Sequence, residues 1–197
     1  MSLNKIMKNK LIIVEGPQGT GKTTLTNYLR EKLSGSNLYR LSGQKDKSKK
    51  GKKYSYKMYS ALLDYLSKMQ EIPMDLIFDR TFFTEEIYAR LGYKDYSFSD
   101  IYEELLKKFN QLKYDKYLLI LYLKNTELYR KRLERDFHHN YQTFSIENSE
   151  NQQQVYMTLS EEIKKNKENT IKVIYLPMDD FEQAYNQIDH LFGGEDS

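Results

Sequence analysis

The chain has 197 residues, of which 39% are hydrophobic and 30% are charged, and its formal net charge is +3. This length and composition predict one folded domain over residues 1–197 and exclude a fibrous or largely disordered chain. Because the chain has no cysteines, disulfide bridges, thiolate metal sites and cysteine nucleophiles are excluded as well.

Short apolar runs alternate with longer amphipathic segments along the chain. The runs are nearly continuous in apolar residues, which is typical of parallel strands covered on both faces. We expect strands at residues 10–16, 37–43, 74–80, 117–123 and 171–177, and helices at 22–34, 54–71, 82–112 with a break near Gly92, 125–137, 149–168 and 179–192. The alternation predicts an α/β fold with a five-stranded parallel sheet flanked by helices on both sides.

A glycine-rich segment, GPQGTGKT, follows the first expected strand at residues 16–23. Its spacing is that of a phosphate-binding loop, or P-loop, between a buried strand and a helix. In such a loop the backbone amides point at a β-phosphate, the lysine contacts β- and γ-phosphate oxygens, and the threonine hydroxyl binds Mg²⁺. We therefore predict a P-loop NTPase fold that binds ATP and Mg²⁺ through Gly16, Gln18, Gly19, Thr20, Gly21, Lys22, Thr23 and Thr24.

A lysine-rich segment, QKDKSKKGKK, follows the second expected strand at residues 44–53. A solvated loop and a basic rim beside a phosphate site both explain this composition. A nucleic-acid surface is a third interpretation, and it predicts DNA binding that weakens steeply with salt. The mild net charge of the chain argues against nucleic acid as a partner.

An acid and an arginine, Asp79 and Arg80, end the third expected strand. Ligand crevices open at the carboxyl ends of parallel strands, so both side chains are candidates for a site. Asp79 there can position metal-bound water, and the planar fork of Arg80 can grip an acceptor phosphate. A structural salt bridge at the strand end is the alternative.

Over most of its length the chain resembles the thymidylate kinase branch of the P-loop nucleotide kinases. Members of that branch carry an Asp-Arg-aromatic motif, then a serine or threonine and a tyrosine on the next helix. Asp79, Arg80, Thr84 and Tyr88 match those places. The resemblance implies that Arg80 and Tyr88 contact the acceptor.

The resemblance also implies an aromatic ring and a basic residue on the helix before the third strand, where the sequence offers Tyr54, Tyr56 and Lys57. Tyrosines at helical spacing are equally consistent with a hydrophobic core. The chain departs from the family in two places. It has Gln18 where an acidic residue is usual, and it keeps Arg40 without the Glu-Pro that follows in the family, so a noncognate monophosphate is an open choice of acceptor.

Polar residues fill positions 138–154, and arginines precede them in NTELYRKRLERDFHH. We expect a mobile lid at about residues 130–154, because polar segments inside compact enzymes are often lids. The P-loop has no arginine to stabilise the charge that builds on a transferring phosphoryl group, so a lid must supply one. Arg130 and Arg135 resemble the family's lid arginines. Arg132 lies between them, and the three cannot all share one helix face.

These observations predict an ATP-dependent deoxynucleoside monophosphate kinase, most simply one acting on dTMP. The catalytic candidates are Lys22, Asp79, Arg80, Arg130 and Arg135, the acceptor-binding candidates are Arg40, Tyr54, Lys57, Arg80 and Tyr88, and the Mg²⁺ candidates are Thr23 and Asp79. No strong base is needed, since the oxygen of a monophosphate is already anionic near neutral pH.

Two alternatives of other kinds stay open. A deoxynucleoside kinase, which phosphorylates a neutral 5′-hydroxyl, needs a carboxylate base near the end of the second strand, and none follows until Asp46. A nucleotide-binding protein without catalysis would not need the intact motif residues. The resemblance further implies a homodimer, and the lack of a long apolar run leads us to expect a cytoplasmic protein with no membrane partner.

Overall fold

A computed structural model of the chain describes residues 9–135 and 145–193. Within these residues, five parallel strands form one sheet in the order β2-β3-β1-β4-β5. The strands are β1 (Lys10–Glu15), β2 (Asn37–Arg40), β3 (Leu76–Asp79), β4 (Asp115–Tyr122) and β5 (Ile171–Pro177). The helices are α1 (Lys22–Lys32), α2 (Lys49–Met69), α3 (Phe82–Arg90), α4 (Ser99–Gln111), α5 (Glu127–Arg135), α6 (Ile146–Lys165) and α7 (Phe181–Phe192). The predicted fold class is confirmed.

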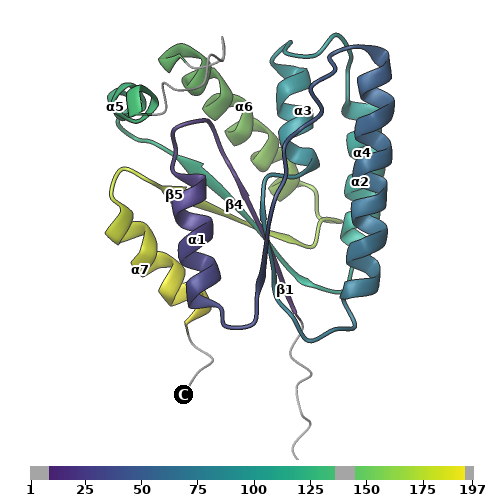
Figure 1. Ribbon diagram of the computed structural model, residues 1–197, viewed down its shortest axis with the longest axis horizontal. Coiled ribbons are helices and arrows are strands. Elements are labelled where there is room, and N and C mark those ends of the chain that lie inside the picture. Colours follow the sequence, from purple (N-terminus) through teal and green to yellow (C-terminus); the bar gives the residue numbers. More distant parts are fainter. Residues whose placement is uncertain (1–8, 136–144, 194–197) are drawn as a thin grey trace, which may run out of the picture.

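Both faces of the sheet are covered, which explains why its central strands β1 and β3 are almost continuously apolar (Figure 1). Alternate residues of β1 point to opposite faces. Leu11 and Ile13 pack in the hydrophobic cluster formed with α2, α3, α4 and α6, whereas Ile12 and Val14 pack in the cluster formed with α1, α5 and α7. Helices α1 and α7 lie side by side, and the rings of Tyr28 and Tyr185 stack between them.

The chain leaves neighbouring strands β1 and β3 toward opposite faces of the sheet. After β1 it continues into α1 on one face, and after β3 it continues into α3 on the other. A crevice therefore opens between the carboxyl ends of these two strands, as the general rule for open α/β sheets requires. The strand ends are in register, since Val14 lies opposite Asp79. The P-loop and the Asp79-Arg80 pair thus flank the same crevice.

Several predicted boundaries are wrong. Helix α2 begins at Lys49, inside the segment expected to be a lysine-rich loop, because the Ser48 side chain accepts a hydrogen bond from the Lys50 amide and caps the helix. The expected break at Gly92 is confirmed, with α3 and α4 as separate helices. Helix α6 begins at Ile146, so residues 146–154 of the predicted lid are helical. Its central part, residues 136–144, falls outside the described residues.

None of the helices that the structure describes is long and apolar enough to cross a bilayer.

Candidate active site

The P-loop follows β1 and leads into α1. Gly21 caps this helix with a φ of 91°, offers no side-chain hydrogen bond, and is followed by no acidic residue in the first turn. The free backbone amides and the positive end of the helix dipole therefore favour an anion. Close approach also demands glycine: a Cβ on Gly16 would lie 2.6 Å from the Leu121 carbonyl oxygen, and one on Gly21 would lie 2.8 Å from the Phe181 ring.

The ammonium group of Lys22 is buried beneath the loop, with only 7% of the residue exposed. Its Nζ donates to the carbonyl oxygens of Gly16 at 2.8 Å and Pro17 at 2.6 Å. The pKa of Lys22 is lowered to about 7, chiefly by burial and also by the nearby charge of Arg80, whereas Asp79 and Glu15 oppose the shift. An anion in the loop would favour the charged ammonium.

Asp79 and Arg80 lie across the crevice from Lys22. The amide of Arg80 donates to the Val14 carbonyl at 3.1 Å, and its Nη1 donates to the Tyr88 hydroxyl at 2.7 Å. Burial lowers the pKa of Arg80, but the hydroxyls of Tyr88 and Tyr156 and the carboxylate of Glu15 raise it by more. The guanidinium therefore stays charged, as phosphate binding requires.

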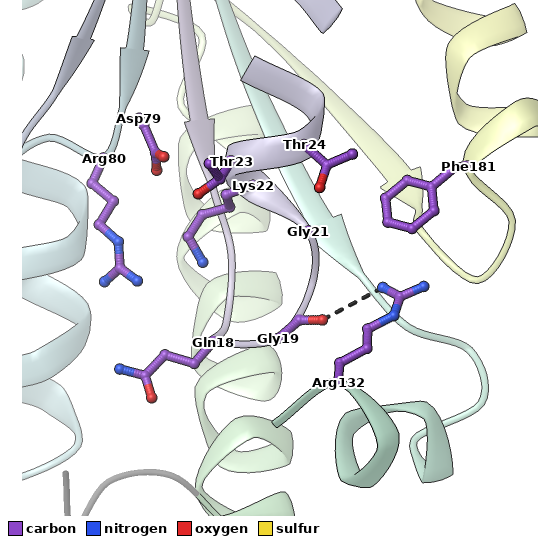
Figure 2. A pocket seen from close by; sticks show the side chains of 10 residues that line it. All are labelled: Gln18, Gly19, Gly21, Lys22, Thr23, Thr24, Asp79, Arg80, Arg132 and Phe181. Atoms are coloured by element: carbon purple, nitrogen blue, oxygen red, sulfur yellow. Dashed lines mark hydrogen bonds between the residues drawn. The ribbon is translucent and has the colours of Figure 1, made fainter. Parts of the chain in front are cut away.

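A cavity of about 590 Å³ connects these groups (Figure 2). Figure 2 shows Arg80 and Asp79 at one end, Lys22 in the middle, and Arg132 with Phe181 at the other end. The cavity is lined by Gln18, Gly19, Gly21, Lys22, Thr23, Thr24, Asp79, Arg80, Arg132 and Phe181. Gly16 and Thr20, also predicted for the loop, lie outside this lining; the Thr20 hydroxyl donates to the Pro17 carbonyl at 2.8 Å.

Arg132 and Phe181 form the wall opposite Arg80. The Arg132 guanidinium lies 4.9 Å from the centre of the Phe181 ring, and its Nη2 donates to the Met178 carbonyl at 2.6 Å. Its Nη1 approaches the Gly19 and Thr20 carbonyls at 3.4 Å. Arg132 was not among the arginines predicted from the sequence to be catalytic, and Phe181 belongs to no motif. The one available signal for Phe181 is its place just after β5, where the carboxyl ends of the strands meet.

The two predicted lid arginines lie elsewhere. The Arg130 side chain is 60% exposed and pairs with Glu127 of its own helix at 3.5 Å. Arg135 ends α5, and its side chain is not among the described groups. The structure therefore does not bring Arg130 to the cavity.

The predicted acceptor-binding residues divide into two groups. Tyr88 reaches the site through Arg80. Arg40 lies at the rim, half exposed, with its Nε 3.9 Å from Asp79 Oδ2 and a hydrogen bond to Asn27. Tyr54 and Lys57 lie on the exposed face of α2, away from the cavity lining.

Glu15, the last residue of β1, is a site residue that sequence reasoning missed. Its carboxylate is fully buried and accepts hydrogen bonds from the Thr81 amide at 2.7 Å, the Thr84 hydroxyl at 2.5 Å and the Tyr156 hydroxyl at 3.1 Å. Burial raises the pKa of Glu15, against these hydrogen bonds and the charge of Arg80. No sequence signal distinguishes it from any polar residue that ends a strand.

Helix α6 contacts the P-loop with side chains from the predicted lid. The Ser149 hydroxyl donates to the Gln18 carbonyl at 3.2 Å, and the Gln18 amide donates to Gln152 Oε1 at 3.3 Å. Both α6 side chains are buried. In this part of the helix, polar residues are therefore structural groups that satisfy the backbone of the loop.

The donor set near Lys22 fits Mg²⁺. Thr23 and Asp79 line the same cavity and offer one hydroxyl and one carboxylate. Magnesium in nucleotide sites commonly takes one or two protein oxygens and completes its shell with phosphate oxygens and water. The two residues predicted for the metal are thus brought together.

Comparisons with known proteins agree with this architecture. The family model described as "ATPase family associated with various cellular activities (AAA)" matches residues 12–145. A search of curated protein sequences finds no match.

Solved structures of nucleotide and nucleoside kinases are similar to this chain. A thymidylate kinase from Candida albicans, described as having broad substrate specificity, aligns with a TM-score of 0.63 at 19% identity over 94% of this chain and 92% of its own. A deoxyadenosine kinase from M. mycoides with dCMP and dCDP bound aligns with a TM-score of 0.65 at 17% identity over 93% and 98%. The same kinase with dATP bound gives 0.58 at 18% identity over 93% and 99%. The resemblance stated from the sequence is confirmed at the level of the fold.

Proposed function

We propose that this chain, which belongs to the ATPase family associated with various cellular activities (AAA), transfers the γ-phosphoryl group of ATP to a deoxynucleoside monophosphate, with dTMP as the first candidate. One observation carries the proposal: a single cavity is lined by Lys22 of the P-loop and by the partly buried guanidinium of Arg80. A P-loop alone holds one polyphosphate. Arg80, a second cation held across the cavity from Lys22, can bind the phosphate of a second substrate.

ATP is the donor in this proposal, with its base toward Arg132 and Phe181. A guanidinium over an aromatic ring offers a flat, polarisable surface of the kind on which nucleobases stack. Thr23 and Thr24 are exposed between that wall and Lys22. This orientation directs the γ-phosphoryl group toward Asp79 and Arg80.

The acceptor phosphate lies at the opposite end, against Arg80. An arginine binds a phosphate through two parallel hydrogen bonds, which fixes the direction of the attacking oxygen. Arg40 at the rim and Tyr88 behind Arg80 support the same end. Tyr54 and Lys57 stay predictions for the nucleoside part of the acceptor.

The chemistry follows from positioning and charge. An anionic oxygen of the acceptor phosphate attacks the γ-phosphorus, the bond from that phosphorus to the β,γ-bridging oxygen breaks, and ADP leaves with the electron pair. Lys22 neutralises charge on the β- and γ-oxygens. Mg²⁺, held through Thr23 and Asp79, would supply further neutralisation. We propose that Arg130 or Arg135 completes the charge stabilisation, and that Arg132 binds the donor.

A second candidate function, a deoxynucleoside kinase, is favoured by Glu85. Its Oε2 lies 3.0 Å from the position of a Cβ on Gly43, just beyond β2, and has no hydrogen-bond partner among the described residues. The fold therefore brings the Glu85 carboxylate close to the end of β2, where the sequence itself has no acidic residue. Its other oxygen pairs with Lys94 at 2.8 Å and accepts from the Tyr96 hydroxyl at 2.6 Å. Those contacts favour a role in shaping the acceptor end over one as a general base.

The experiment that decides between these functions measures Mg²⁺-dependent formation of ADP from ATP. It uses separate panels of deoxynucleoside monophosphates and free deoxynucleosides. We expect turnover with one or more monophosphates and none with nucleosides. Turnover with nucleosides alone would contradict the acceptor role of Arg80 and favour the second candidate. ATP binding without turnover on either panel would contradict both.

Three further proposals concern the domain organisation, the cellular location and the oligomeric state of the protein. We propose that residues 1–197 are one kinase domain, that the protein works in the cytoplasm on small-molecule nucleotides, and that it forms a homodimer. Size-exclusion chromatography with light scattering tests the last of these: a molar mass near 23.6 kDa at micromolar concentration would contradict it.

A further inference from the structure

The turn that carries Arg80 has an unfavourable backbone conformation. Its φ is 72°, and within the described residues it is the one non-glycine residue with a positive φ. Such a conformation persists only where surrounding contacts hold it. Two backbone amides provide contacts here: the amide of Arg80 donates to the Val14 carbonyl at 3.1 Å, and the amide of Thr81 donates to Glu15 Oε1 at 2.7 Å.

Glu15 therefore connects two parts of the cavity. It lies directly before Gly16 of the P-loop in the sequence, and its side chain reaches across to the turn after β3. The Thr81 hydroxyl also lies 3.3 Å from Oε1, so this one oxygen has two donors from the residue that follows Arg80.

The second oxygen of Glu15 ties the same turn to α6. The Thr84 hydroxyl and the Tyr156 hydroxyl donate to Oε2 at 2.5 Å and 3.1 Å, and the two hydroxyls lie 3.1 Å apart. All three residues are at most 1% exposed. Burial of a carboxylate is costly unless its hydrogen bonds are made, and here both carboxylate oxygens accept hydrogen bonds.

Glu15 does not line the cavity, so it has no direct contact with a ligand there. We propose that Glu15 is a positioning residue: its carboxylate, with Thr84 and Tyr156, fixes the Arg80-Thr81 turn so that the Arg80 guanidinium points at the acceptor phosphate. This inference rests on the proposed function for the role of Arg80, although the hydrogen-bond network itself does not.

The chain offers substitutions that remove single members of the network. Thr84→Val keeps the shape of the side chain and removes the hydroxyl, whereas Thr84→Ser keeps the hydroxyl. Tyr156→Phe removes one donor from α6. Tyr175→Phe is its matched control, because the Tyr175 hydroxyl likewise joins a strand to α6, through Ser160 and Glu161, and lies outside the network.

We expect Thr84→Val and Tyr156→Phe to weaken binding of the monophosphate about tenfold, as the loss of one hydrogen bond to a charged group predicts. Binding of ADP, measured by calorimetry, should change less than about twofold, because Lys22 and the loop amides remain in place. Thr84→Ser should restore monophosphate affinity, and Tyr175→Phe should leave it unchanged. Equal losses for ADP and monophosphate would overturn the inference, since a merely structural defect affects both ends.

Hydrogen exchange separates this inference from the proposed function. Thr81 is 3% exposed and its amide donates to Glu15, so Glu15→Gln should accelerate exchange of this amide at least about tenfold. The exchange of the Leu25 amide in α1 should stay slow. If the wild-type protein binds ADP but no monophosphate, the proposed function fails. Whatever the outcome for the proposed function, equally slow exchange of the Thr81 amide in wild type and Glu15→Gln would also overturn the inference about the turn.

Discussion

The two ends of the cavity are built in different ways. The end assigned to ATP consists of loop amides, the exposed hydroxyls of Thr23 and Thr24, and the wall of Arg132 and Phe181. The end assigned to the acceptor depends on buried side chains around Arg80. The ATP end can bind an anion once the Lys22 ammonium exchanges its hydrogen bonds to the Gly16 and Pro17 carbonyls for bonds to phosphate oxygens. The acceptor end depends on contacts between distant segments.

Two loops are joined to each other beside Glu85 of α3. Lys94 donates to the Gln44 carbonyl, the Asp95 amide donates to the Lys47 carbonyl at 2.9 Å, and Glu85 pairs with Lys94. The loop after β2 is thereby joined to the loop after α3. Choice among acceptors should therefore depend on these loops, whereas ATP binding should not.

The largest effect should come from the P-loop lysine. Lys22→Ala removes the cation that faces the β- and γ-phosphates, and we expect turnover to fall by about a thousandfold or more. The measurement is ADP formation at saturating ATP and acceptor. Lys32→Ala, at the exposed end of the same helix, is the control. Unimpaired turnover in Lys22→Ala would contradict the whole assignment of the site.

Substitution of Arg80 should weaken binding at the acceptor end of the cavity and leave the ATP end unchanged. Arg80→Gln removes a charged fork, so we expect the KM for the monophosphate to rise about a hundredfold while the affinity for ADP stays within about twofold. Steady-state kinetics with the acceptor varied, together with ADP calorimetry, measure the two quantities. The exposed Arg30, replaced in the same way, serves as the control. A comparable loss of ADP affinity would mean that the two ends are not separate.

Substitutions of Arg132 and Arg130 should have different effects on ADP affinity, although both residues belong to α5. Arg132→Gln loses the contact with Phe181, so ADP affinity should fall about tenfold. Arg130→Gln should leave ADP affinity unchanged, because its side chain lies away from the cavity in this structure. If Arg130 rather than Arg135 is the proposed charge-stabilising arginine, the same substitution lowers kcat. Calorimetry and single-turnover rates compare the pair. If ADP affinity falls equally in both variants, the wall formed by Arg132 and Phe181 is not the donor-base site.

The smallest effect is a proton uptake at the ATP end. The pKa of Lys22 is lowered to about 7 by burial, so the group is mostly neutral at pH 8, and a bound phosphate should restore its charge. We expect ADP binding at pH 8 to take up close to one proton, seen as a binding heat that depends on the ionisation enthalpy of the buffer. The lowered pKa of Lys22 also affects the free energy of unfolding of the ligand-free protein. Between pH 7 and about 10.5 the lysine is protonated in the unfolded chain but neutral in the folded one, so this free energy rises with pH. A buffer-independent heat would contradict the buried state of Lys22.

Sequence patterns predicted the parts of this protein that depend on local spacing. The strands, the P-loop and the Asp79-Arg80 pair follow from continuous apolar runs and from a motif whose glycines are required by Leu121 and Phe181. The start of α2 at Lys49 was also within reach, because Ser48 precedes a run of lysines with good helix propensity.

Parts that depend on tertiary contacts were not predictable. Helix rotation decides that Arg132 rather than Arg130 reaches the cavity, and that Ser55 and Tyr59 rather than Tyr54 face inward on α2. The polar start of α6 was predicted to belong to a mobile lid, since the sequence does not show that Gln152 contacts the P-loop amide of Gln18. Such partners are distant in sequence and leave no local pattern.

The most direct test of a two-ended cavity is the binding of adenosine and thymidine joined by a polyphosphate chain. Calorimetry should give one ligand per chain and an affinity at least about a hundredfold tighter than that of ADP, because the second end binds at a high effective concentration. Arg80→Gln should remove most of this gain. An affinity equal to that of ADP, in wild type and variant alike, would contradict the claim that Arg80 and the P-loop hold two phosphates of one reaction.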